Sequence, residues 1–266
     1  MSPHPDWRDR LLASWWRRHW RGFLSLRRLL GRTNGVRGVT PYGSTFLLDP
    51  LSYIDGIVLT DGFYESEVLD ALRAATSTGT VVWDIGANFG LHAMTLARLV
   101  PGATIVAFEP NPSEHARLLR HRAWNAPAAL TSSVALSSSN GMLPLHLGPA
   151  GNSGMTTLSP WSQGGYSGTV LVATARGDDL VAADVVPAPQ VIKLDVEGHE
   201  AEVLRGLSAV LRRPECSLVV FEDALEATTE PKQLLEAAGF QLSSLERREP
   251  TAHPLGNFVA RKRTRS

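Results

Sequence analysis

Short apolar segments alternate with amphipathic segments from Thr80 onward. The apolar segments TVVWDI, TIVAFE, ALTSSVAL, QVIKLD and SLVVFE are typical of buried strands, and LHAMTLARLV, PSEHARLLRHRAW, HEAEVLRGLSAVLRR and EPKQLLEAAG between them have helical spacing. This alternation predicts a parallel sheet with helices on both faces. FQLSSLE and GNFVARK suit a closing hairpin. Residues 137–175 interrupt the rhythm with Ser, Gly and Pro clusters, so we expect an insertion beside the sheet.

Upstream of the alternation, TFLLD predicts a short strand and YESEVLDALRAA a helix. Residues 6–30 differ, because Trp16, Trp20 and Phe23 fall near helical spacing with arginines interleaved. They predict a basic amphipathic helix. One interpretation is peripheral contact with an anionic membrane surface; the other is docking on its own domain or on a second subunit of a homodimer. Nucleic acid is not expected as a partner, because no known reader motif accompanies the basic residues.

Length and composition indicate how many domains the chain has and in which cellular compartment we expect it. With 266 residues and 43% hydrophobic content, the chain suits one core domain. Turn formers from Gly31 to Gly43 place a boundary near residue 40, which divides the chain into a helix and linker (1–40) and an α/β domain (41–266). The single cysteine, Cys216, rules out an intrachain disulfide and a multi-cysteine zinc site. Without an apolar run of roughly 18–20 residues or a signal-peptide pattern, we expect a cytoplasmic protein, with membrane contact at most peripheral.

The segment VVWDIGANFG, at 81–90, indicates a nucleoside site, because a strand ends in an acid before a glycine-containing turn. This segment does not match a phosphate-binding loop, since Leu91 and His92 follow Gly90 where that motif has Lys and then Ser or Thr. The dinucleotide-binding motif has its second glycine at the position of Asn88, so this segment matches that motif only in part. NAD is therefore the alternative cofactor. S-adenosylmethionine has no phosphate, so its binding turn requires only a close approach of the backbone to the ligand.

Three residues suit that cofactor by position. Gly86 would let the backbone pass under the aminoacyl group, and Asp84 could accept from the ammonium. Glu109 ends the next strand and could accept from both ribose hydroxyls, which fits either nucleotide.

Three segments, VVWDIGANFGLHA, VAFEPNP and above all IKLDVEGHEAEVLRG, resemble the motifs of FkbM-type S-adenosylmethionine-dependent methyltransferases. The resemblance runs from about Asp61 to Asp223. It implies a Rossmann-like class I methyltransferase fold, with a seven-stranded, mostly parallel sheet and an antiparallel last strand. The residues that it assigns to the methionine part are Asp84, Gly86, Ala87, Asn88 and Gly90; to the ribose, Glu109 and Asn111; and to the adenine, Ser133, Val134 and Ala135, where an acidic residue often stands.

Tyr64 and Glu65 lie upstream of these motifs. Tyr64 could line the ligand pocket, as could Tyr53, although ordinary packing explains either. Glu65 could reach the cofactor's ammonium, or it could serve as an acid at a helix N-terminus.

Methyl transfer from a sulfonium needs a positioned acceptor and a base for the hydroxyl proton. The catalytic candidates are Asp195, His199 and Glu222, with Glu197 nearby. The structural alternative is that Glu197 and His199 cap the following helix and that Asp195 orients the turn. A divalent metal held by Asp195 and Glu222, with Asp223 as a third ligand, is an alternative that we do not expect.

The sequence therefore predicts an S-adenosylmethionine-dependent O-methyltransferase acting on a hydroxyl of a sugar, a glycan or a natural-product scaffold. The arginine- and tryptophan-rich helix favours a glycan or glycolipid near a membrane. An NAD-dependent oxidoreductase or epimerase, or a catalytically silent binding module, are the other interpretations.

Overall fold

The structure is a computed structural model that describes residues 35–160, 165–225, 227–246 and 255–263. The helix expected at 6–30 lies outside these ranges. The boundary expected near residue 40 stays a prediction; within residues 35–40 the chain forms strand β1 (Val36–Val39), which pairs with β2 (Thr45–Leu48) beyond that boundary. In the described part of the chain, no helix is long and apolar enough to cross a membrane.

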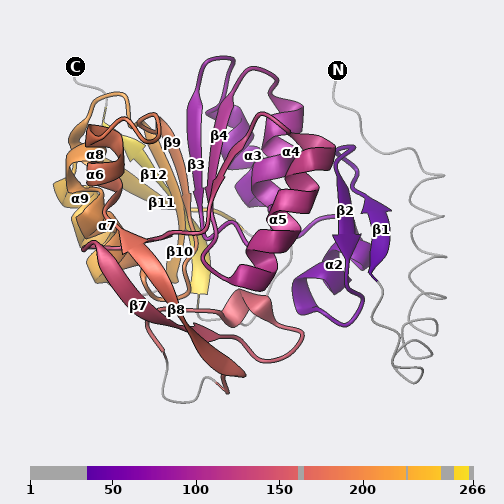
Figure 1. The fold of residues 1–266 in the computed structure, drawn as a ribbon. Helices are drawn as coiled ribbons and strands as arrows, with labels where there is room; N and C mark the ends of the chain where they lie inside the picture. The colour runs from indigo at the N-terminus through magenta and orange to yellow at the C-terminus, as the bar shows by residue number, and fades with distance from the viewer. Residues whose placement is uncertain (1–34, 161–164, 226, 247–254, 264–266) are drawn as a thin grey trace.

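The centre of the fold is a seven-stranded sheet in the order β11-β12-β10-β9-β3-β4-β5 (Figure 1). Its strands are β3 (Val81–Ile85), β4 (Thr104–Phe108), β5 (Leu130–Ser132), β9 (Val191–Leu194), β10 (Leu218–Ala224), β11 (Phe240–Ser244) and β12 (Leu255–Lys262). β12 alone among them runs antiparallel to both neighbours. The predicted α/β fold, the seven strands and the closing hairpin are confirmed.

Helices cover both faces of this sheet because its strands send alternate side chains to opposite sides. In β3, Val82 packs with α3 (Ser66–Ala74), α4 (Leu91–Leu99) and α5 (Pro112–Asn125), whereas Trp83 packs with α7 (Glu200–Gly206) and α8 (Ser208–Arg212). Two further helices, α6 (Gly177–Ala182) and α9 (Glu230–Ala237), join the second face. Continuous apolar runs such as VVWDI are the consequence of burial on both faces.

Residues 137–175 form the expected insertion, and together with β6, which directly precedes them, they make a three-stranded sheet in the order β6-β8-β7. It consists of β6 (Ala135–Leu136), β7 (Gly141–Leu147) and β8 (Gly168–Ala175), with a short 3₁₀ helix at Ser153–Met155. The segment ALTSSVAL is therefore not one strand. Its first half is β5 of the large sheet, and its second half is β6, which pairs with β8.

The predicted helix HEAEVLRGLSAVLRR is also divided, at Leu207, into α7 and α8. α7 lies so close to the start of the insertion that a Cβ on Gly206 would be 2.0 Å from the carbonyl oxygen of Ser137. Helix α2 (Tyr53–Asp61) was not predicted, because its apolar positions give no clear helical stripe.

Candidate functional site

A cavity of about 620 Å³ opens where the carboxyl ends of β3, β4, β9 and β10 meet the insertion and α2. Parallel sheets bind ligands at this edge. Most of the predicted site residues line it together, namely Tyr64, Glu65, Gly86, Ala87, Asn88, Glu109, Val134, Ala135, Asp195, His199 and Glu222. We call residues 86–88, 109 and 134–135 the glycine-turn side, and Asp195, Glu197 and Glu222 with residues 152–157 the carboxylate side.

The turn after β3 passes directly against the end of β9. The amides of Gly86 and Ala87 both donate to the carbonyl of Phe108, at 3.0 and 2.9 Å. Gly86 has φ +80°, and a Cβ there would lie 1.7 Å from the carbonyl oxygen of Asp195. Glycine is required at this position both by its backbone conformation and by the close approach.

Glu109 closes this turn from the next strand. Its Oε2 accepts from the amide of Asn88 and its Oε1 from the amide of Asn111, each at 2.7 Å. Burial raises the pKa of Glu109 to about 8, although the two amide hydrogen bonds oppose that shift. The carboxyl group lines the cavity and is held in one orientation, as a pair of ribose hydroxyls would require.

Asp84 lies beneath the turn, outside the cavity lining. Its Oδ2 accepts from the amide of Ala93 at 3.1 Å in the first turn of α4, and its Oδ1 lies 3.5 Å from Lys193 Nζ. Burial raises the pKa of Asp84, and the charge of Lys193 opposes that rise. The side chain of Asp84 thus contacts α4 and Lys193, and its predicted contact with a ligand stays a prediction.

Three other predicted residues also lie outside the lining. Asn111 caps α5, because its Oδ1 accepts from the amide of Ser113 at 3.1 Å. Gly90 is the N-cap of α4 with φ +89°, and a Cβ on it would lie 2.5 Å from Leu118 Cδ1. Ser133 is exposed. Their predicted contacts with a ligand stay predictions.

On the carboxylate side, one oxygen each of Asp195, Glu197 and Glu222 lie within 4.8 Å of one another. Burial, followed by the charges of Asp195 and Glu222, raises the pKa of Glu197 to about 9. Asp223 does not join them, because its Oδ1 accepts from the amide of Ala224 at 2.7 Å and its Oδ2 bonds the hydroxyl of Thr229. Glu197 therefore replaces Asp223 as the third carboxyl group that could face a cation.

His199 lies between two serine hydroxyls, with Nε2 3.0 Å from Ser137 Oγ and Nδ1 2.9 Å from Ser159 Oγ. Its side chain makes no capping hydrogen bond to α7. Burial lowers the pKa of His199, so the ring is neutral near pH 7. The histidine joins the insertion to the turn after β9, and its predicted catalytic role stays a prediction.

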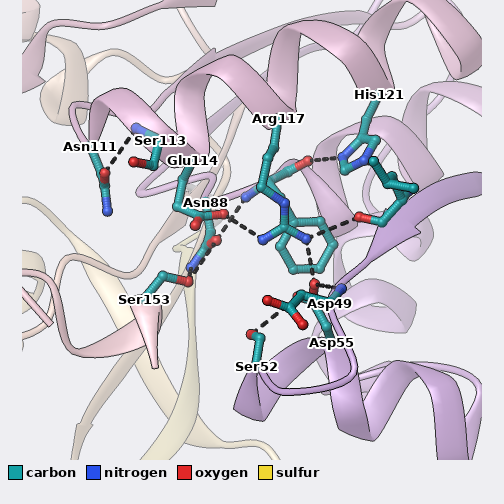
Figure 2. A network of polar contacts seen from close by, with 12 residues as sticks. Asp49, Ser52, Asp55, Asn88, Asn111, Ser113, Glu114, Arg117, His121 and Ser153 are labelled. Carbon is teal, nitrogen blue, oxygen red and sulfur yellow. Dashed lines mark hydrogen bonds and ion pairs between the residues drawn. The ribbon is translucent and has the colours of Figure 1, made fainter. Parts of the chain in front are cut away.

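A buried network around Arg117 fixes the walls of the cavity (Figure 2). The guanidinium of Arg117 contacts Asp55 Oδ2 at 2.5 Å and Glu114 Oε2 at 2.8 Å, and it stacks 4.5 Å from the centre of the Phe89 ring. The side chains of Asn88 and Ser153 meet at 3.3 Å in the same view. Helix α5 therefore holds α2, the glycine turn and the insertion against one another.

Several lining residues were not predicted. Lys193 has a signal in the sequence, since it is the one charged residue within the apolar strand VIKL. Ile54, His92 and residues 152–157 also line the cavity, and they have no local motif. They reach the site through α2, α4 and the insertion, so only the tertiary fold brings them there.

Comparison with known proteins agrees with this architecture. Residues 84–242 match the family model of the methyltransferase FkbM domain. The chain is 30% identical to the hexuronic acid methyltransferase AglP of Haloferax volcanii, over 82% of this chain and 86% of that one. It is 29% identical to the 2-O-methyltransferase NoeI of Sinorhizobium fredii, over 47% of this chain and 56% of that one. A fibrillarin of Aeropyrum pernix with bound S-adenosylmethionine is more distant, at 14% identity and a TM-score of 0.46, over 73% of this chain and 74% of that one.

Proposed function

This chain belongs to the FkbM family of S-adenosylmethionine-dependent methyltransferases, and we propose that it methylates a hydroxyl oxygen of a sugar. The observation that carries the proposal is one cavity that joins the glycine turn and Glu109 to the carboxylate of Asp195. The names of the two relatives support a sugar acceptor in one case and transfer to oxygen in the other.

The glycine-turn side fits the cofactor. Gly86, Ala87 and the buried Glu109 all line the cavity on this side. Val134 and Ala135 offer apolar surface where an adenine would lie. When bound, S-adenosylmethionine supplies an electrophilic methyl group.

On the carboxylate side, Asp195 is the base that the proposal requires. Its side chain is 32% exposed, so it reaches the cavity, and Lys193 Nζ donates to its Oδ2 at 3.0 Å. Asp195 would accept the proton that the acceptor hydroxyl gives up as the oxygen gains the methyl group. Burial raises the pKa of Tyr64, so its phenol keeps its proton and can donate to an acceptor oxygen.

The direct test is an acceptor panel with labelled S-adenosylmethionine. Methyl glycosides, phenols and aliphatic alcohols would be compared, and mass spectrometry would locate the added methyl group. We expect transfer to a glycoside hydroxyl. Binding of S-adenosylhomocysteine without transfer to any acceptor would support the silent binding module, and transfer only to the non-sugar alcohols would support a natural-product scaffold.

We propose that the reaction needs no divalent metal. The cluster of Asp195, Glu197 and Glu222 could hold one, but Lys193 already balances part of its charge from one side. EDTA should leave turnover unchanged. Loss of activity with EDTA and recovery with Mg²⁺ would instead assign these three carboxylates to a metal.

Residues 6–30 lie outside the described residues, and we propose from the sequence that they contact anionic membrane surfaces. Arginines near such a surface contribute about 1 kcal/mol each. The full chain should therefore co-sediment with anionic liposomes more than with neutral ones, and salt should weaken this binding. A chain lacking residues 1–34 should lose the binding and keep its cofactor affinity. A change of oligomeric state on truncation would favour the homodimer instead.

A further inference from the structure

Lys193 is a charged residue in the floor of the cavity. It lies in β9 between β3 and β10, in a strand whose four residues are all buried, and it is 5% exposed. Burying an ammonium group is costly unless it is paired. Burial alone would lower the pKa of Lys193, and the charges of Asp195 and Asp84 more than reverse that effect, so the pKa is raised. The side chain is therefore protonated.

The two carboxylates next to Lys193 belong to different parts of the site. Asp84 is its directly paired neighbour on β3, 3.5 Å away, and is itself fixed by the amide of Ala93 at the start of α4. Asp195, 3.0 Å away, is half-exposed at the cavity. Lys193 thus pairs both with Asp84, which is fixed at the start of α4, and with Asp195, which faces the cavity.

We propose that Lys193 is a positioning residue for methyl transfer, which holds the carboxylate of Asp195 in the orientation that receives the acceptor's proton. The inference rests on the proposed function. Asp84 is the anchor of this arrangement, because its own position is set by the backbone of α4. A purely structural role, in which Lys193 only neutralises buried Asp84, is the interpretation that the experiment must exclude.

The experiment compares Asp84→Asn with the double variant Asp84→Asn/Lys193→Met. Lys193→Met alone would leave buried Asp84 unpaired and is expected to fold poorly. The asparagine keeps an oxygen for the amide of Ala93, so Asp84→Asn removes the buried charge that Lys193 would otherwise serve to neutralise. Thermal midpoints and calorimetric affinities for S-adenosylhomocysteine should match closely between the single and the double variant.

The single variant Asp84→Asn and the double variant should differ in turnover. At saturating S-adenosylmethionine, with the glycoside that the wild type methylates, the double variant should have a kcat about tenfold or more below that of Asp84→Asn, with KM for the acceptor within about threefold. Asp84→Asn/Lys193→Arg, which restores a cation, should recover part of the lost kcat.

Equal kcat in Asp84→Asn and the double variant would overturn the proposal and assign Lys193 to folding alone. A change confined to acceptor KM would also overturn it, because a misplaced base lowers kcat. Failure of the proposed function is a separate result: the wild type itself would then methylate no glycoside, while its affinity for S-adenosylhomocysteine remained measurable.

Discussion

The two sides of the cavity are built in different ways. The glycine-turn side comes from two neighbouring strands, β3 and β4, and the turns that directly follow them, so residues 84–111 supply most of its contacts. The carboxylate side gathers Asp195, Glu222 and residues 152–157 from a strand end, a second strand end and the insertion. One side is local in sequence, and the other depends on long-range packing. Changes on the first should affect cofactor binding, and changes on the second should affect turnover.

The largest effect is expected for Gly86→Ala, because its Cβ would lie 1.7 Å from the carbonyl oxygen of Asp195 and its φ is +80°. The turn and the end of β9 must separate, so the affinity for S-adenosylhomocysteine should fall at least about 1,000-fold by calorimetry. Gly79→Ala is the matched control. Gly79 has φ +85° with no atom within 4 Å of its added Cβ, so it should cost about 1 kcal/mol of stability and leave binding unchanged. Equal losses in both variants would show that backbone strain, and not the collision, decides binding.

Asp195→Ala should lower kcat by about 100-fold or more while the affinity for S-adenosylhomocysteine stays within about threefold. Asp195 faces the cavity from the carboxylate side, so its loss should not disturb the glycine turn. Steady-state kinetics and calorimetry on the same preparation measure both quantities. Asp223→Ala is the control, since that carboxylate is turned toward Thr229. Unchanged turnover in Asp195→Ala would remove this residue from the chemistry.

Glu109→Ala should weaken the binding of S-adenosylhomocysteine by about 1.5–3 kcal/mol, through the loss of charged hydrogen bonds to the ribose. The same change also frees the amides of Asn88 and Asn111. A ligand without the two ribose hydroxyls separates these effects. If Glu109 binds the hydroxyls, deleting them and deleting the carboxylate should be strongly non-additive. Simple additivity would restrict Glu109 to supporting the turn.

The smallest effect is a pH dependence of cofactor binding. The pKa of Glu109 is raised to about 8 in the free protein, so the group is largely protonated at pH 7. Ribose hydroxyls favour the ionised form, and binding below pH 8 therefore releases a proton. Affinity for S-adenosylhomocysteine should rise by at most about tenfold per pH unit up to pH 8 and then level off. Calorimetry in buffers of different ionisation enthalpy measures the proton. Glu109→Ala should lose this slope, and an equal slope in the variant would assign the proton to another group.

The sequence predicted parts of both sides of the cavity: Asp195, His199 and Glu222 line it together, whereas four residues predicted for the other side, Asp84, Gly90, Asn111 and Ser133, lie outside the lining. A strand, a glycine turn and the acid at the next strand end are fixed by local backbone geometry, so their grouping could be anticipated from spacing alone. His199 and Asp223 show the limit of this reasoning. His199, in the turn after β9, is enclosed by serines of the insertion, and Asp223, next to the predicted strand end at Glu222, turns toward Thr229. The split of ALTSSVAL between two sheets also depends on β8, where Thr174 pairs with Ala135, and no local pattern specifies that pairing.

The antiparallel strand β12 has a consequence for synthesis of the protein. It lies between β10 and β11, and Asn257 within it pairs with Glu222 and donates to Glu65 Oε1 at 3.0 Å. Both partners belong to the cavity, yet β12 is the last of the described strands to leave the ribosome. Until it does, the nascent chain exposes one edge of β10 and lacks a support of its carboxylate side. A ribosome-bound chain can therefore complete the glycine turn early, but it acquires the whole cavity only after β12 has emerged.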